Sequence, residues 1–399
     1  MNTPREFTAI LTQMIGRRAS LGLSPEDMDR ALAVGPGWTS LIESGQSDPP
    51  ISVLLALLKA LNLPPEEAFS NLPLGALSGT LPRLFTWDSE ESDLILRFPY
   101  GRYDATHRLR NVSSHNMDEV VSILRNGLAN VIGTRDPSDA SKAMTQAVTL
   151  TFLKAVSIWP KANPSDLWWF LVYRAFSDPF NHPAVNARLD FGQSWKRTGG
   201  WALEEILVRH YRETLEKSGI RMFIATDEEK SRMAARFEVV DRFEADKVDI
   251  FLAGITPEDR DKGFDKVFGV VHVKASFAER RTDDVPMSRE LIHSGYVSPL
   301  CTMDCKSMPS AHPINRGELG AAMPTTGNRD TRSAKRKDIE EDGYFSACFS
   351  YNKNTVPTPD TQGAAARIYS CDFSDPNDEF TAFLVKAWAN FQARGSVTQ

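Results

Sequence analysis

The feature that most constrains this chain is a strand-like run that leads into a cluster of charges, VVHVKASFAERRTDD over residues 270–284. Val270, Val271 and Val273 suit the middle of a buried sheet. Because side chains alternate along a strand, His272 and Lys274 share one face of it. Charged side chains are rarely buried without a partner. A fold that buries this strand must therefore supply acids for Lys274 and a role for the charges that follow.

The composition is that of an ordinary globular protein. The chain has 399 residues, 41% hydrophobic and 25% charged, which is enough for two or three domains. Its net charge of −6 gives no global sign of nucleic-acid binding, so a basic surface would have to be local. No apolar run approaches the ~20 residues of a membrane span, the N-terminus lacks a signal-peptide core, and four cysteines are too few for a disulfide scaffold. We expect a cytoplasmic protein with no membrane contact.

Residues 7–70 are predicted to form a run of short helices. Apolar residues recur at helical spacing, and Ser24 followed by Pro25 and acids is typical of a helix start. The stretch GLSPEDMDRALAVGPGWTSLIESGQSDPPISVLLALLKAL resembles the lambda-repressor-like (Xre-type) helix-turn-helix domain. The resemblance implies DNA contact through WTSLIESG. Between residues 21 and 50, however, five acids face Arg30 as the single cation, which favours dimerisation or docking instead.

The character of the sequence changes near residue 190. Residues 76–100 are rich in Pro, Gly, Ser and acids, which is typical of a linker or a domain edge, and residues 326–342 are predicted to be a charged loop. Helical patterns occur near 117–130, 138–158, 165–177, 201–217 and 378–394, and strand-like runs lie between the last two. This order predicts an α/β domain. We expect three segments: a helix-turn-helix-like domain at 1–75, a linker and helical region at 76–190, and the α/β domain at 191–399.

Two acids are candidates for partners of Lys274. Asp249 lies within DKVDIFLAG, where an acid is costly to bury unless it is paired or bound to a cation. In the helix 201–217, Glu204 falls inside the apolar arc and Glu205 outside it. Two acids and a lysine suit metal-dependent phosphodiester hydrolysis, in which the acids hold Mg²⁺ and the lysine orients water or stabilises negative charge. For Asp249 alone, a bond to a lysine or a backbone amide is the simpler alternative.

Other catalytic signatures are absent from the sequence. There is no Walker A loop, G-x-G-x-x-G, H-E-x-x-H or G-x-S-x-G. A second D-x-K triplet, Asp304-Cys305-Lys306, lacks an upstream acid of its own. Four side chains could in principle bind a metal, but they do not have the spacing of a zinc site, so they are interpreted as structural. They are Cys301, Cys305, His312 and Cys348.

Three runs, RTGGWALEEIL, KVDIFLAG and VVHVKASFAERR, together resemble the PD-(D/E)XK nucleases. More narrowly, HVKASFAERRTDD with SRELIHSGYVSPL is similar to BsaWI-type restriction endonucleases of the CCGG-cutting group. The resemblance covers roughly residues 190–330. It implies an α/β core of a mixed sheet flanked by helices, behind an all-α N-terminal region. It also implies a catalytic metal site made by Glu204, Asp249 and Lys274.

The chain departs from the motif of this family at one position. The usual acid two residues before the lysine is His272 here, and CCGG cutters recruit a glutamate from the next helix in its place. Glu290 is the favoured candidate for this third catalytic and metal-binding acid, and Glu279 is the runner-up.

The resemblance further implies that the charges after Lys274 read the bases of CCGG. The R-(D/E)-R motif is incomplete because Ala278 precedes Glu279 and Arg280, so Arg281 is taken to stand in. Arginine bonds guanine O6 and N7 in bidentate fashion, and a glutamate accepts a hydrogen bond from cytosine N4. The alternative is an ordinary surface helix start with salt bridges.

Together these features predict a type II restriction endonuclease that cleaves double-stranded DNA at a palindrome containing CCGG, with Mg²⁺ as cofactor. A palindrome requires a two-fold protein, so we expect a homodimer or a higher homo-oligomer. The resemblance also implies a cognate DNA methyltransferase in the same system. Two alternatives stay open: a helix-turn-helix regulator with a non-catalytic C-terminal domain, and a non-specific PD-(D/E)XK nuclease.

Overall fold

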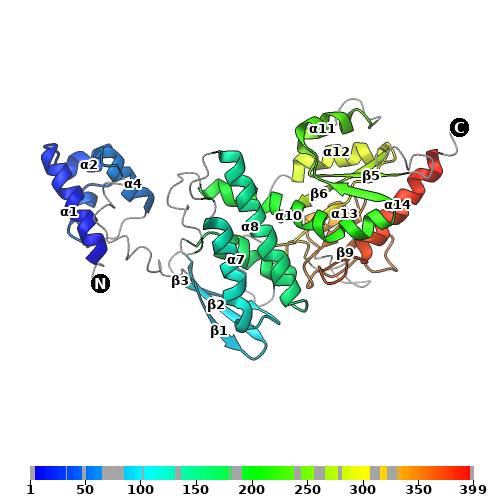
Figure 1. The fold of residues 1–399 in the computed structure, drawn as a ribbon, viewed down its shortest axis with the longest axis horizontal. Coiled ribbons are helices and arrows are strands. Elements are labelled where there is room, and N and C mark those ends of the chain that lie inside the picture. Colours follow the sequence, from blue (N-terminus) through cyan, green and yellow to red (C-terminus); the bar gives the residue numbers. More distant parts are fainter. Residues whose placement is uncertain are drawn as a thin grey trace. The chain divides into compact units, whose positions relative to one another are not determined.

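The protein divides into two compact units, Met1–Arg83 and Leu84–Gln399, in the computed structural model (Figure 1). The structure describes residues 5–32, 34–46, 51–64, 85–100, 103–129, 131, 136–178, 181, 191–237, 244–255, 266–276, 281–305, 315–320, 330 and 332–395. Among these residues, no helix combines the length and the apolar character needed to cross a membrane.

The N-terminal unit is a small helical domain, as expected. It contains α1 (Arg5–Ser20), α2 (Pro25–Ala31), α3 (Trp38–Glu43) and α4 (Ile51–Ala60) around a leucine-rich core. Asp29 of α2, only 4% exposed, accepts hydrogen bonds from the Gly37 amide at 2.7 Å and the Thr39 amide at 2.8 Å. A side-chain acceptor of this kind satisfies the free amides at a helix start. Asp29 therefore fixes the turn between α2 and α3.

The C-terminal unit begins with a sheet that sequence reasoning missed. Strands β1 (Thr86–Glu90), β2 (Asp93–Tyr100) and β3 (Tyr103–Leu109) form a three-stranded antiparallel sheet. The prediction of a linker over 76–100 is thus wrong for residues 86–100. The reason is the alternation of Leu94, Leu96 and Phe98, which all point into the main core.

The predicted helical region is confirmed. A short 3₁₀ turn (Ser114–Asn116) leads into α7 (Met117–Ala129), α8 (Pro137–Ile158) and α9 (Pro164–Trp168), which continues as a π-helix, η2 (Trp169–Ala175). The long helix α10 (Phe191–Lys217) begins earlier than the expected residue 201. Gly199 does not end it, because this residue packs tightly: an added Cβ would lie 3.3 Å from Cγ1 of Val172.

The predicted mixed sheet is also confirmed, with six strands in the order β4-β5-β6-β7-β8-β9. The pairs β4–β5 and β5–β6 are antiparallel and the remaining pairs are parallel. Its strands are β4 (Ile220–Phe223), β5 (Ile250–Gly254), β6 (Lys266–Lys274), β7 (Leu300–Thr302), β8 (Cys348–Ser350) and β9 (Ile368–Ser370). The accompanying helices are α11 (Asp227–Ala234), a 3₁₀ turn (Ala245–Lys247), α12 (Arg281–His293), α13 (Ala334–Glu340) and α14 (Glu379–Gly395).

The two faces of this sheet bury different cores. On β5, Ile250 and Leu252 pack into the main core with α10 and α14. Phe251 lies on the other face, in a core that includes Met287 and Leu291 of α12. The sheet is thus covered by α12 on one side and by α10 and α14 on the other (Figure 1). Cys301, Cys305 and Cys348 are buried as free thiols, and burial raises their pKa values.

The charged stretch 326–342 was expected to be a loop, yet it contains α13. Ser333 caps this helix by accepting a hydrogen bond from the Arg336 amide at 3.1 Å. Inside the fold, the Glu340 carboxylate accepts from Arg336 Nε at 2.9 Å and from Arg332 Nη1 at 3.1 Å. Arg336 and Glu340 are both essentially unexposed. The prediction failed because these charges pair with one another in the interior rather than with water.

Because of this buried ion cluster, we expect substitutions of two adjacent glutamates to have very different effects on the free energy of unfolding. Glu340→Ala leaves Arg336 buried without an acidic partner and removes one of the three acids around Arg332, so it is expected to lower the free energy of unfolding by about 3–5 kcal/mol. Glu341→Ala removes a half-exposed partner of Arg332 and is expected to cost no more than about 1 kcal/mol. Urea unfolding of the two variants measures the difference. Equal shifts would contradict the central role of Glu340.

Candidate active site

The candidate site is built around the amine of Lys274, at the end of β6. Its Nζ atom lies 2.9 Å from Oδ2 of Asp284 and 3.2 Å from Oδ2 of Asp249. The same Asp249 oxygen accepts a hydrogen bond from the Val273 amide at 2.7 Å. Asp249 lies directly before β5 and Asp284 lies in the first turns of α12. One lysine therefore joins two strands and the helix that covers them.

Electrostatics hold this lysine in its charged form. Burial acts to lower the pKa of Lys274, but the carboxylates of Asp249 and Asp284 outweigh burial and raise the pKa above its ordinary value. An ammonium ion with two acidic partners can donate hydrogen bonds and stabilise negative charge, but it does not act as a base at neutral pH. The arrangement is thus suited to stabilising an anion.

Glu204 adds a further carboxylate from α10. The side chain is partly buried, and its pKa is raised to about 8, chiefly by burial. The negative charge of Asp249 contributes to this rise, and the positive charge of Lys274 opposes it. The two acids therefore repel each other across a short space, and a cation between them would remove that repulsion.

His272 occupies the motif position where an acid is usual. It is fully buried, its Nε2 lies 2.9 Å from Oγ of Ser298, and its Nδ1 lies 4.0 Å from Oδ2 of Asp284. Burial lowers the pKa of His272, which favours the neutral ring. The imidazole therefore packs behind Asp284 and adds no negative charge to the site.

The acids fit a hard divalent cation that the substrate helps to bind. In the part of the chain that the structure describes, no three His, Cys, Asp or Glu side chains converge into a preformed metal cage. Mg²⁺ does not require one, because it is usually bound by one or two carboxylates together with water and substrate phosphate. Glu204 and Asp249 supply two such carboxylates.

Comparisons with known proteins identify the family. Residues 16–69 match a helix-turn-helix domain family. The type II restriction enzyme AgeI of Thalassovita gelatinovora is 39% identical over 247 residues, which cover 60% of this chain and 82% of that relative. This chain is a type II restriction endonuclease. The crystal structure of a specific AgeI–DNA complex matches it with a TM-score of 0.60 at 35% identity, over 73% of this chain and 99% of the other.

BsaWI is only a distant structural neighbour. A BsaWI–DNA complex matches this restriction endonuclease with a TM-score of only 0.35 at 15% identity, over 69% of this chain and 94% of the other. A likeness of that size carries no argument. The supported statement is that the enzyme is AgeI-like and carries an N-terminal helix-turn-helix domain.

The structure brings together Glu204, Asp249 and Lys274, and it adds Asp284 in the place considered for Glu290. Glu290 is exposed on α12, six residues after Asp284, which turns it about 240° around the helix. Sequence reasoning missed Asp284. A usable signal existed, because Asp284, Met287 and Leu291 share one buried face at helical spacing.

The structure describes only part of the segment that is predicted to read the bases. Glu279 and Arg280 lie outside the described residues, and Arg281 is described only as the first residue of α12. In the competing D-x-K triplet, Asp304-Cys305-Lys306, the aspartate has a structural role. Asp304 is unexposed and accepts hydrogen bonds from the Leu319 amide at 3.0 Å and the Thr355 hydroxyl at 2.7 Å, and Lys306 lies outside the described residues.

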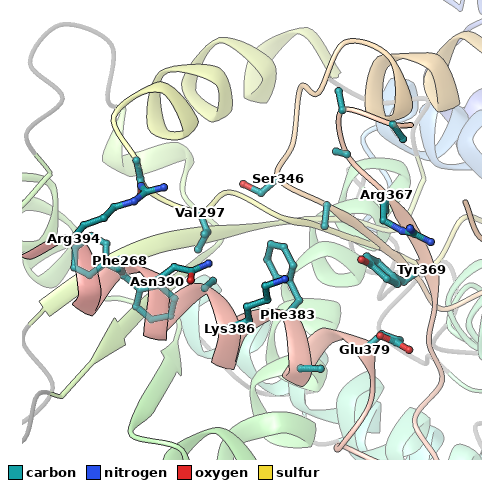
Figure 2. Close-up of a pocket in the computed structure, with 18 residues that line it drawn as sticks. Phe268, Val297, Ser346, Arg367, Tyr369, Glu379, Phe383, Lys386, Asn390 and Arg394 are labelled. Carbon is teal, nitrogen blue, oxygen red and sulfur yellow. The ribbon is translucent and has the colours of Figure 1, made fainter. Parts of the chain in front are cut away.

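A cavity of about 540 Å³ between α14 and the sheet is distinct from the candidate site (Figure 2). Phe268, Phe383 and Lys386 line it, and it includes neither Lys274 nor any acid that surrounds this lysine. This cavity is therefore a feature separate from the Lys274 cluster.

The raised pKa of Glu204 makes stability depend on pH. A carboxyl group that titrates near 8 when folded and near 4.5 when unfolded holds its proton more tightly in the folded state, so stability falls as the pH rises through this window. Glu204→Gln is therefore expected to raise the melting temperature of metal-free enzyme above pH 8 and to change it little near pH 4.5. Thermal scans in EDTA across this range measure the effect. A variant without any gain at high pH would mean that Glu204 is not strained by its neighbours.

Proposed function

We propose that this restriction endonuclease cleaves double-stranded DNA at a palindrome containing CCGG by a Mg²⁺-dependent PD-(D/E)XK mechanism. The observation that carries the proposal is the Lys274 amine, which is held between Asp249 and Asp284 with Glu204 nearby. An ammonium group and acids at adjacent strand ends suit attack on a phosphodiester. The AgeI structure, which is a complex with DNA, supports duplex DNA as the substrate.

Glu204 and Asp249 are assigned as the residues that hold Mg²⁺. When bound, Mg²⁺ supplies positive charge beside the attacked phosphate and makes a nearby water more acidic. The like-charge repulsion that contributes to the raised pKa of Glu204 supports this assignment, because a cation bound by both carboxylates would offset it. A bound cation would therefore lower the pKa of Glu204 and favour its ionised form.

Lys274 is assigned to the phosphate and the attacking water. Its ammonium group orients the water by hydrogen bonding and stabilises the negative charge that develops on a phosphate oxygen. The water oxygen bonds to phosphorus while the bond from phosphorus to the leaving sugar oxygen breaks. The water loses a proton to solvent and the leaving oxygen gains one, so the reaction balances.

Asp284 is assigned the role of the acid that follows the lysine, in place of Glu290. Its Oδ2 contacts the Lys274 amine at 2.9 Å and lies against the neutral ring of His272. The exposed position of Glu290 supports the exchange. Asp284 thereby holds the amine toward the position of the scissile phosphate.

Base reading is assigned to the charges that precede and begin α12. Glu279, Arg280 and Arg281 combine an acceptor for cytosine N4 with two bidentate donors for guanine, which suits a core made only of G·C pairs. Because such a site is palindromic, we assign a homodimer or a higher homo-oligomer as the active species. A cognate methyltransferase that protects host sites completes the proposed system.

The helix-turn-helix unit is assigned to assembly rather than to base reading. In a groove-reading helix, cations contact phosphates and polar side chains contact base edges. Here Arg18 pairs with Glu43 of α3, with Nε 2.6 Å from Oε1, and Arg30 pairs with Asp27. Leu41, 45% exposed, is the large side chain that α3 presents to solvent. This surface suits contact with protein.

The proposal is tested by incubating purified enzyme with unmethylated phage DNA, with and without Mg²⁺, and sequencing the ends. Discrete fragments that end at one CCGG-containing palindrome, formed only with the metal, are expected. A smear would indicate a non-specific nuclease. Discrete ends at a site without CCGG would contradict the assigned reading of the core.

The catalytic assignments predict a sharp contrast along α12. Lys274→Ala is expected to abolish cleavage yet keep specific DNA binding in Ca²⁺, because binding does not need the amine. Asp284→Asn is expected to slow cleavage by about 10²-fold or more, since it removes the charge that holds Lys274. Glu290→Gln is the matched control on the same helix and should cut at the normal rate. Single-turnover rates decide between the two acids: a slow Glu290 variant beside a normal Asp284 variant would reverse the assignment.

The reading assignment predicts a loss of discrimination. Arg280→Ala removes a bidentate guanine contact and is expected to lower the preference for the cognate site by about 1–3 kcal/mol. Arg289→Ala, an exposed arginine later on α12, serves as the control. Competition binding in Ca²⁺ with cognate and mismatched duplexes measures the preference. Unchanged discrimination in the Arg280 variant would locate the reader elsewhere.

A further inference from the structure

A second cavity opens beside the catalytic acids. It has a volume of about 740 Å³, within the range of about 300–1,000 Å³ that is typical of ligand pockets. One wall is formed by α10, including Glu204, another by the first half of α8, and Ile224 after β4 closes it. Because Glu204 is shared by this cavity and the proposed metal site, whatever fills the cavity lies next to the scissile phosphate.

The α10 wall exposes an aromatic side chain. Trp201 is 45% exposed and Ile224 is 38% exposed, which is unusual for such large apolar groups. Trp201 precedes Glu204 by three residues, so the two lie on one helix face with Cβ atoms about 5–6 Å apart. An indole beside a catalytic acid offers an apolar surface with a polar edge.

The α8 wall offers hydrogen-bonding groups. Ser138, Lys142 and Gln146 follow one another at intervals of four residues, so they form one stripe. The Lys142 side chain is 76% exposed, and its contact with Asp139 is long, at 3.7 Å. The hydroxyl of Thr145, which also lines the cavity, is buried and has no hydrogen-bond partner among the residues that the structure describes. A buried hydroxyl without a partner is costly unless a ligand satisfies it.

We propose that this cavity holds the DNA strand that leads away from the cleaved bond, with Trp201 packed against a sugar and Lys142 paired with a neighbouring phosphate. This inference rests on the proposed nuclease site and extends it. Backbone contacts of this kind fix the register of a duplex without reading its sequence. The cavity has one apolar wall and a row of uncharged hydroxyl and amide groups, and of its two cations Arg209 is paired with Glu205 at 2.7 Å, which leaves Lys142 as the cation best placed for a phosphate of a sugar-phosphate chain.

The salt dependence of DNA binding tests the role of Lys142. The probe is a labelled fragment of unmethylated phage DNA that contains CCGG, bound in Ca²⁺ so that no cleavage occurs. Lys142→Ala is expected to reduce the slope of log K against log salt by about 0.9, the value for one phosphate contact. Lys217→Ala is the matched control, because Lys217 is similarly exposed at the far end of α10 and pairs with Glu213. It should leave the slope unchanged.

The affinity for the same probe tests the role of Trp201. Trp201→Ala is expected to weaken binding about tenfold, whereas Trp201→Phe retains most of the affinity. Val385→Ala, which removes an exposed apolar side chain on α14, is the control. Both tests use binding alone, so they remain informative even if the cleavage site differs from the proposed one.

The possible results separate this inference from the nuclease proposal. Wild-type slopes and affinities in the Lys142 and Trp201 variants would overturn the cavity assignment while leaving the catalytic cluster intact. A Trp201 variant that loses its oligomeric state in sedimentation, with unchanged binding per protomer, would show that the cavity is a contact between copies of the chain. An enzyme that binds the probe but never cleaves DNA would overturn the nuclease proposal and leave the binding surface standing.

Discussion

The C-terminal unit depends on one ion pair system, the Lys274 amine between Asp249 and Asp284. A lysine at the end of a buried strand is unfavourable by itself, since a buried charge must be compensated. Asp249 compensates it from the start of β5 and Asp284 from α12, at 3.2 Å and 2.9 Å. The interaction also places the amine at the edge of the sheet. The fold and the site are thus fixed by the same contacts, so a change in one of these acids alters both.

Periodicity made much of this arrangement predictable. The alternation along β6 placed Lys274 on one face with His272, and the helical arc in α10 placed Glu204 toward the interior. The helical N-terminal unit was recognisable from its periodicity, and the mixed sheet was implied by the family resemblance. Local patterns suffice where one face of a regular element is buried.

The failures have three separate causes. Nothing near Glu340 indicates that Arg332 and Arg336 accompany it into the interior, so a charged stretch looked like a loop. Asp284 was passed over because a family pattern suggested a glutamate, although the helix spacing favoured the aspartate. The strand β2 was hidden by the polar residues that precede it. Burial of paired charges explains the first failure, whereas Asp284 and β2 each had a usable local pattern, the helical spacing of one and the apolar alternation of the other.

The position of Asp284 has a consequence for how well the enzyme discriminates between correct and incorrect DNA sites. It lies three residues after Arg281, within one turn of the same helix, so a side chain assigned to reading and a side chain assigned to chemistry share a rigid body. If a wrong base pair shifts the first turn of α12, Asp284 shifts with it. A displacement on the order of 1 Å near reacting atoms can cost about 10²-fold in rate. Such an enzyme would reject incorrect sites twice, once by weaker association and again by slower turnover on the duplexes that it still holds.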